Sequence, residues 1–301
     1  MRELTFMRDL RCLPLLRDGV TARYEGSIDK AGGNADWDWS LYRDERGEWV
    51  LFDHQGAGCV YNFVQHRYPD SPEPTFRFYF DGEEEPRFVI RHSQFGEVYP
   101  FIEPLAGRYI GPIDGGRGPI RVVRSFVPMP YAKSCKITSD IKLEGCRREC
   151  GEGGWGHVIY HVYTDGREVE TFRPDEEDYT ALAAFWKRSG GSVIPFERGE
   201  QEESGVFALR PGESRRVFAA DGAGLIAGIR CRTKEYRRED VSALWLRAVW
   251  DGHGQADLEL PFGCLFGNEL GYHGGAACWP VCRRKGRIIT RCPCRIPRRR
   301  S

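Results

Sequence analysis

The stretch Thr75-Phe-Arg-Phe-Tyr-Phe-Asp-Gly-Glu83 decides the fold class, because it is an apolar strand that ends in an Asp-Gly turn. The phrase returns as Leu244-Trp-Leu-Arg-Ala-Val-Trp-Asp-Gly252. Around it, Gly56-Ala-Gly58 and Phe95-Gly96 recur as Gly222-Ala-Gly224 and Phe266-Gly267. The Asp-Gly pairs lie 170 residues apart and the glycine pairs 166, which indicates an aligned duplication. A repeat of this length is too long for a solenoid and predicts two related domains.

Working outward, the chain is built from short apolar segments separated by Gly, Pro and Asp. The predicted strands are 49–52, 59–64, 76–80, 88–90, 120–126, 135–138 and 157–163, and then 205–209, 215–218 and 225–229. Strands of this length with turn signals about every ten residues are typical of an antiparallel sandwich. A single helix is predicted at 176–189, with an apolar stripe that begins at Tyr179 and a Gly190-Gly191 stop.

These segments divide the chain into four parts. Residues 1–24 form an N-terminal helical segment and residues 25–190 a first β-sandwich. A charged linker leads to a second, partial sandwich at 205–275, into which only about five of the eight strands of a jelly roll fit. Residues 276–301 are an Arg- and Cys-rich tail. We interpret the tail as non-native or disordered, since the second copy breaks off just before it.

Charge and cysteine content are dominated by this tail. It holds eight Arg, one Lys and no acid, so the remaining residues carry 35 basic and 44 acidic side chains. An acidic body argues against nucleic acid as a partner, although the tail alone could bind it. Four of the eleven Cys lie in the tail, in a spacing unlike that of a zinc finger. The seven others are expected to be buried free thiols.

No apolar run is long enough to span a membrane, and the N-terminal residues contain acids where a signal peptide would be apolar. We therefore expect a cytoplasmic protein without a membrane partner. His157 and His161 share a strand face, but two His without a third ligand do not make a metal site. Neither a metal nor a cofactor is expected.

The order of these motifs resembles a known family. The residues that carry the resemblance are Ser27–Asp36, Asp53–Gly58, Phe80-Asp-Gly-Glu83, Phe95-Gly96, Pro128–Ile137 and Pro261–His273. They are similar to the domain of unknown function 2961 family, now placed with glycoside hydrolase family 172. The resemblance covers about residues 20–273. It implies two jelly rolls, assembly into a homo-oligomer (a trimer or a multiple of it), and action on furanosides, including difructose anhydrides.

The resemblance also implies two catalytic Glu in the later jelly roll. Retaining cleavage needs two carboxylates about 5–5.5 Å apart. Here Ala243 and Trp245 occupy the strand where one would be expected, and only Glu269 offers a carboxylate nearby. Glu269 is therefore the candidate catalytic residue, with an unknown partner; the alternative is a turn residue at a strand end. The chain is predicted to be truncated before its catalytic carboxylates and inactive.

A second candidate site is the loop before the first long strand. Asn34, Asp36, Trp37, Asp38 and Trp39 alternate polar and indole side chains. Sugars stack on indoles and hydrogen-bond to carboxylates and amides, so this loop is the predicted substrate-binding segment. The alternative places Trp37 and Trp39 in the core or at a subunit interface. The function expected is that of a furanoside glycoside hydrolase family, or otherwise of a non-catalytic carbohydrate-binding or scaffold sandwich.

Overall fold

The computed structural model describes residues 3–9, 12, 17–33, 39–68, 71–113, 119–143, 154–176, 178–188, 201–226, 228–232, 243–265, 282–284, 287–290 and 294–296. The chain divides into two compact units: Met1–Arg8 with Leu16–Lys187, and Asp9–Leu15 with Arg188–Ser301. In the described ranges, no helix is both long and apolar enough to cross a membrane.

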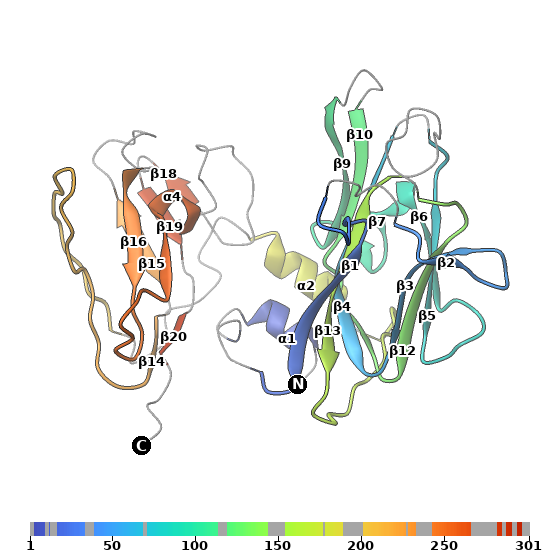
Figure 1. Cartoon of the computed structure of the whole chain (residues 1–301), viewed down its shortest axis with the longest axis horizontal. Helices are drawn as coiled ribbons and strands as arrows, with labels where there is room; N and C mark the ends of the chain where they lie inside the picture. The colour runs from blue at the N-terminus through green and yellow to red at the C-terminus, as the bar shows by residue number, and fades with distance from the viewer. Residues whose placement is uncertain are drawn as a thin grey trace. The chain divides into compact units, whose positions relative to one another are not determined.

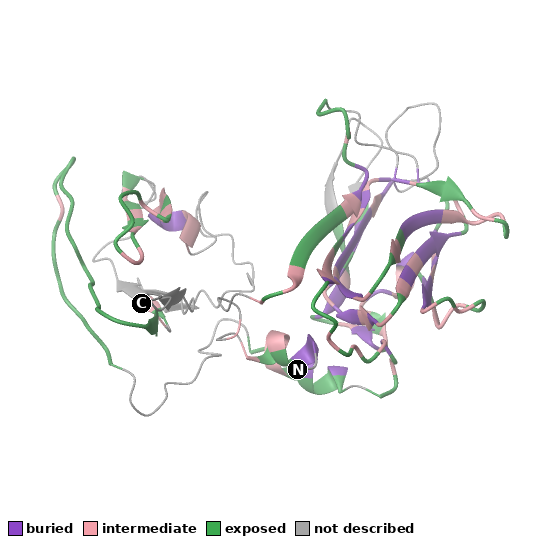
Figure 2. Ribbon diagram, turned by 60° about the horizontal axis from the view of Figure 1, so that its bottom comes forward, coloured by how far each residue is buried: buried purple, intermediate pink, exposed green. Residues whose placement is uncertain are grey.

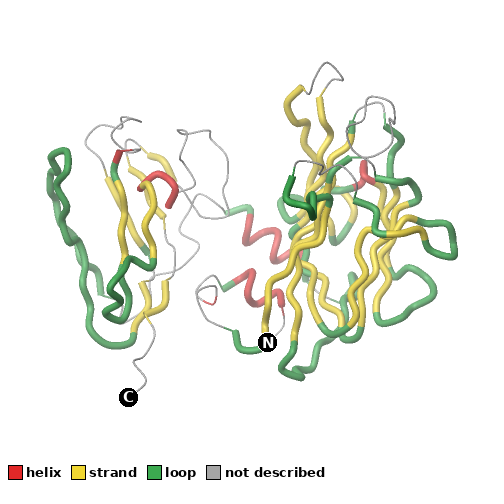
Figure 3. Tube along the Cα trace, viewed as in Figure 1, coloured by secondary structure: helices red, strands yellow, loops and turns green. Residues whose placement is uncertain are grey.

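The first unit is built from two antiparallel sheets (Figures 1 and 3). The six-stranded sheet contains, in order, β1 (Val20–Gly26), β13 (Gly156–Tyr163), β4 (Gly58–Arg67), β10 (Pro119–Ser125) and β9 (Ala106–Ile113), with β11 (Met129–Tyr131) also paired to β4. The five-stranded sheet contains β2 (Tyr42–Arg43), β3 (Trp49–Gln55), β12 (Ser134–Ser139), β5 (Thr75–Phe80) and β6 (Phe88–Arg91). β7 (Glu97–Val98) and β8 (Phe101–Ile102) form a small separate pair.

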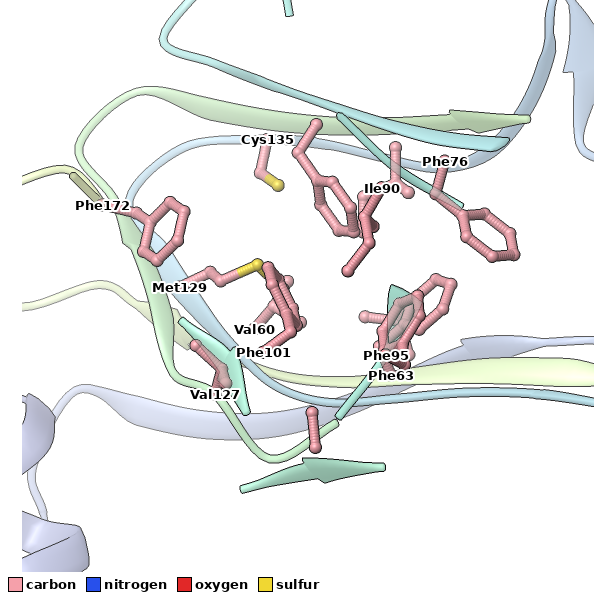
Figure 4. Packing of buried hydrophobic residues seen from close by; sticks show 14 of the residues in the cluster. Val60, Phe63, Phe76, Ile90, Phe95, Phe101, Val127, Met129, Cys135 and Phe172 are labelled. Atoms are coloured by element: carbon pink, nitrogen blue, oxygen red, sulfur yellow. The ribbon is translucent and has the colours of Figure 1, made fainter. Parts of the chain in front are cut away.

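The topology is that of a jelly roll. Taking β1, β3, β4, β5, β6, β10, β12 and β13 as strands one to eight, the two sheets run 1-8-3-6 and 2-7-4-5. Both sheets contain buried residues (Figure 2), and their apolar side chains fill the space between the sheets (Figure 4). Val60, Phe63 and Val123 come from one sheet, and Phe76, Phe78 and Ile137 from the other. The predicted all-β sandwich is confirmed, and every strand predicted before residue 190 is present.

Two helices lie at one end of this sandwich. The predicted helix is confirmed as α2 (Tyr179–Trp186), which begins later than expected because Asp178 caps it by accepting a hydrogen bond from the Ala181 N–H at 2.9 Å. Tyr179 and Leu182 are buried, as the stripe indicated. In the N-terminal segment, α1 (Glu3–Arg8) is helical, but β1 begins at Val20 and belongs to the sandwich. A 3₁₀ turn, η2 (His92–Gln94), follows β6.

The second unit is made of short strands. They are β14 (Gly224–Ile226), β15 (Ile229–Arg232), β16 (Trp245–Ala248), β17 (Leu258–Pro261), β18 (Cys282–Arg284), β19 (Arg287–Thr290) and β20 (Cys294–Ile296), with the helix α4 (Phe262–Leu265). The strands predicted at 205–209 and 215–218 are wrong. These residues are irregular, and Val206 and Val217 are exposed. An alternating pattern gives a stable strand only where a neighbour pairs with it and covers its apolar face.

The tail and the cysteines have mixed outcomes. β18, β19 and β20 lie in the tail, where β19 pairs with β15 and β20 with β14, while its non-native origin stays a prediction. Cys59 and Cys135 are free and fully buried, as expected, and burial raises the pKa of both thiols. Cys264 is free but only partly buried, and Cys12 is likewise only partly buried.

The duplicated phrase forms the same hairpin twice. In the first unit, Asp81 and Gly82 have φ values of 52° and 82°; in the second, Asp251 and Gly252 have 51° and 71°. Two consecutive positive φ angles define the turn that suits a β-hairpin, and Asp-Gly is among the residue pairs that adopt it most readily. The Asp-Gly prediction is thus confirmed at both sites. In both copies a short helical turn follows the second strand, η2 in the first and α4 in the second.

The hydrogen bonds of the two hairpins also correspond. The matched pairs are Glu83 N–H to Phe80 O (2.9 Å) with His253 N–H to Trp250 O (2.9 Å), Arg87 to Phe78 (2.9 Å) with Asp257 to Ala248 (2.9 Å), and His92 to Pro74 (3.0 Å) with Phe262 to Leu244 (2.7 Å). An ion pair joins the same two positions with reversed polarity: Glu83 with Arg87, and His253 with Asp257. The two hairpins therefore share these three backbone hydrogen bonds.

Candidate functional site

The predicted sugar-binding loop is only partly covered by the described residues. Asn34, Asp36, Trp37 and Asp38 lie outside them, as does the candidate catalytic Glu269. Trp39 is 1% exposed, and its ring packs against Phe63 with 5.6 Å between centroids. A Cβ at Gly156 would come within 2.1 Å of the Trp39 ring, so Gly156 makes room for it. Trp39 is therefore a core residue, which was one of the alternatives that the sequence left open, and its ring offers no surface on which a sugar could stack.

A pocket of about 470 Å³ lies elsewhere in the first unit, where the helices meet the turn between β5 and β6. Its lining comes from four regions of the sequence. They are α1 (Glu3, Leu4), the β5–β6 turn (Asp81, Arg87), the start of β11 (Pro128, Pro130), and the segment from the end of β13 to the start of α2 (Glu170, Thr171, Phe172, Arg173, Glu176, Tyr179). This size falls in the range of small-molecule sites.

Asp81 connects the residues of one wall of the pocket through hydrogen bonds. Its Oδ1 accepts hydrogen bonds from the Lys133 N–H at 2.6 Å and the Ser134 N–H at 3.2 Å, and its Oδ2 accepts one from the Thr171 hydroxyl. Burial by itself raises the pKa of Asp81, but these three donors and the nearby Arg87 more than offset it and lower the pKa. Asp81 is therefore an ionised, fully used acceptor and a poor proton donor.

Arg87 forms the adjoining wall. Its Nε donates to both carboxylate oxygens of Glu83, at 2.9 and 3.1 Å, and its Nη1 donates to the Phe172 carbonyl at 2.7 Å. The guanidinium also lies 5.4 Å from the centroid of the Phe80 ring. These contacts tie the hairpin to the segment that follows β13 and fix the shape of the pocket.

The outer rim of the pocket is charged and open to solvent. Glu170, Arg173 and Glu176 are exposed, and Arg173 pairs with Glu176 at 2.7 Å. Carboxylates and guanidinium groups placed side by side can accept from and donate to neighbouring hydroxyl groups of one sugar ring. Sequence reasoning missed these residues because they lie on an irregular segment without a motif. The one sequence feature that could have identified them is their position just before the predicted helix.

Metal binding has no support among the described residues, which contain no group of three or more His, Cys, Asp or Glu able to hold an ion. His157, one of the two His on β13, instead makes a hydrogen bond through Nε2 with Asn62 Oδ1 at 3.0 Å. Burial lowers the pKa of His157 and keeps it neutral.

Comparison with protein families agrees with the fold and its two-part organisation. A family model described as the GH172 first beta-sandwich domain matches residues 18–180. A second, described as GH172 domain-like, matches residues 199–277. A comparison with curated proteins found no match. Because the first model alone covers more than half of a 301-residue chain that folds as the sandwich it describes, the chain belongs to glycoside hydrolase family 172.

Proposed function

We propose that this chain is a carbohydrate-active protein that binds furanosides, with the pocket beside α1 and α2 as a binding site. Its membership of a glycoside hydrolase family supports a carbohydrate ligand. The observation that carries the proposal is the pocket itself, whose rim combines Glu170 and Glu176 with Arg173. Furanoside specificity, a homo-oligomeric assembly and a cytoplasmic location are the finer parts of the proposal and rest on the resemblance in sequence.

Binding without catalysis is the form of this function that we favour. Of the lining carboxylates away from the exposed rim, Asp81 already accepts three hydrogen bonds, and the buried Glu3 pairs with Arg17 at 3.4 Å. Glu176 is already engaged in an ion pair with Arg173 at 2.7 Å. With Glu269 as the lone candidate in the second domain, the chain offers no assigned pair for retaining cleavage.

The test is titration calorimetry of the full chain with arabinofuranosyl and fructofuranosyl oligosaccharides. Glu170→Gln should weaken binding about tenfold or more, the usual consequence of losing a charged hydrogen bond. Glu168→Gln, two residues away, exposed and outside the pocket lining, is the matched control and should bind like the wild type. Absence of binding, or equal effects of the two variants, would refute the pocket as the site.

The same preparations should show no turnover of aryl furanosides above a buffer control. Turnover that Glu269→Gln abolishes would refute the non-catalytic form of the proposal while leaving carbohydrate as the ligand.

A further inference from the structure

A like-charge pair lies at the end of the sandwich opposite the pocket. Arg67 ends β4, and in the antiparallel register it lies directly across from Arg121 on β10. Directly opposed residues of neighbouring strands present their side chains to the same face, and like charges there repel each other. Among the described residues, neither guanidinium has a carboxylate within ion-pairing distance. The arrangement therefore places two positive charges together, and Glu73, which forms no ion pair with either of them, is the described carboxylate whose charge acts on Arg67.

The face in question is the inner one. Val123 lies two residues along β10 from Arg121, on the same face, and belongs to the core between the sheets. On β9, the residue that pairs with Val123 is Arg108. Arg67 is 7% exposed, whereas Arg121 is exposed and so connects this region to solvent. The β9–β10 hairpin marks this end of the unit in Figure 1.

Several buried polar atoms around Arg67 have no hydrogen-bond partner. They are Arg67 Nε, Ser71 Oγ, His92 Nε2 and Gln65 Oε1, in side chains that are between 0% and 7% exposed. The four residues are neighbours: Arg67 Nη1 donates to the Ser71 carbonyl, and Gln65 precedes Arg67 on the same face of β4. Buried polar groups normally have partners, so several orphaned ones together point to a missing group.

The electrostatics of His92 fit this grouping. Burial first, and then Arg67, lower its pKa to about 3; Arg108 and Arg121 act in the same direction and Glu73 opposes them. Glu73 itself is held by the Ser93 N–H at 2.5 Å. The imidazole is thus neutral, and the excess positive charge belongs to the arginines.

We propose that Arg67, Arg121, Ser71 and His92 bind a phosphate group. The guanidinium groups and the hydroxyl match the oxygens of a tetrahedral anion, and a ring N–H of His92 can supply a further donor. The P–OH of phosphate at neutral pH can donate to Gln65 Oε1. The anion would screen the two arginines from each other. Eight residues of β4 separate this site from the level of Pro130 in the carbohydrate pocket, about 27 Å along the strand, so it is a second site.

The test is thermal unfolding of the full chain in millimolar sodium phosphate and in sodium chloride of equal ionic strength. Phosphate should raise the Tm in a concentration-dependent way, since a ligand of the folded state stabilises it. Arg121→Gln should leave the Tm in chloride unchanged or higher, because a repulsion between like charges is removed. It should also raise the apparent Kd for phosphate, obtained from the concentration dependence of the Tm, about tenfold. Arg124→Gln, an exposed arginine of the same strand on the opposite face, should respond like the wild type.

Two further arms identify the source of the phosphate and guard against misfolding. Ribose 5-phosphate acting at lower concentration than inorganic phosphate assigns the site to a sugar phosphate, and the reverse order assigns it to free phosphate; neutral ribose should have no effect. Ser71→Ala should keep the Tm in chloride and lose part of the phosphate shift. Equal Tm values in phosphate and chloride for the wild type, or equal phosphate responses of Arg121→Gln and Arg124→Gln, would overturn the proposal.

Discussion

At the scale of single residues, Asp81 and Asp251 show how one turn signal acquires different roles. Both adopt a positive φ angle in the same hairpin turn. Of these two carboxylates, only that of Asp81 accepts hydrogen bonds from other described residues; the donors are Lys133, Ser134 and Thr171. The local sequence determines the turn, whereas the surrounding sandwich determines what the carboxylate binds.

Replacing Asp81 by Asn separates these two roles, since Asn also tolerates a positive φ angle. Asp81→Asn should lower the free energy of unfolding by about 1–3 kcal/mol through the loss of charged hydrogen bonds. Asp251→Asn should change it by less than about 0.5 kcal/mol, as surface substitutions usually do. Chemical denaturation of both variants measures this, and equal effects would contradict the assignment.

The pH dependence of this contribution follows from its sign. Because the pKa of Asp81 is lowered in the folded state, its stabilisation is complete above the ordinary value of 3.8 and is lost as the pH falls through the lower folded value. The wild type and Asp81→Asn should therefore converge in stability at acid pH.

At the scale of elements, the two hairpins keep an ion pair at the same positions with opposite polarity. In the β16–β17 hairpin, His253 Nδ1 lies 2.5 Å from Asp257 Oδ1, and Asp257 Oδ2 accepts the Trp250 N–H at 2.7 Å. The hydrogen bond with Asp257 raises the pKa of His253. The pair is therefore complete when the imidazole is protonated, below 6.5, and is lost as the pH rises through the folded pKa of His253.

This pair can be checked by NMR titration of the His253 ring. In the wild type the resonance should titrate above 6.5, and in Asp257→Asn it should move back towards that value, because the carboxylate that favours the charged ring is gone. His157, in the first unit and distant in sequence, serves as the internal control and should titrate identically in both proteins. An unchanged His253 curve would show that the hairpin does not form this bond in solution.

At the scale of the whole molecule, the buried apolar residues are divided unequally. Among the described residues, the core cluster runs from Leu4 to Ala183 and lies entirely in the first unit. Among the described apolar side chains of the second unit, only that of Phe262 is buried, with 9% of its surface exposed. Burial of apolar surface is the main stabilising contribution to folding, and among the described residues the first unit carries most of it.

A fragment of residues 1–188 should therefore unfold cooperatively at about the same temperature as the main transition of the full chain, followed by near-ultraviolet circular dichroism of its packed aromatic rings. A fragment of residues 189–301 should show no such transition. A first fragment that lacks the near-ultraviolet signal would mean that the sandwich depends on the second unit.

The sequence by itself determined the features that depend on neighbouring residues. Alternating strands, the α2 stripe that begins at Tyr179 and the two Asp-Gly turns follow from local backbone preferences and side-chain period, and the duplication could be read from spacing alone. The irregular structure around Val206 and Val217 could not be predicted in this way. A strand forms only where a neighbouring strand pairs with it, and the sequence of one segment does not show whether such a neighbour exists.

Only the tertiary structure decided where side chains distant in sequence meet. Trp39 entered the core because Gly156, more than a hundred residues later, leaves space for its ring. The pocket joins α1, a hairpin turn and an irregular segment, and the Arg67–Arg121 pair exists only through the register of β4 and β10. Such contacts depend on how strands are ordered in the sheets, and long-range pairing leaves no periodic mark in either partner alone.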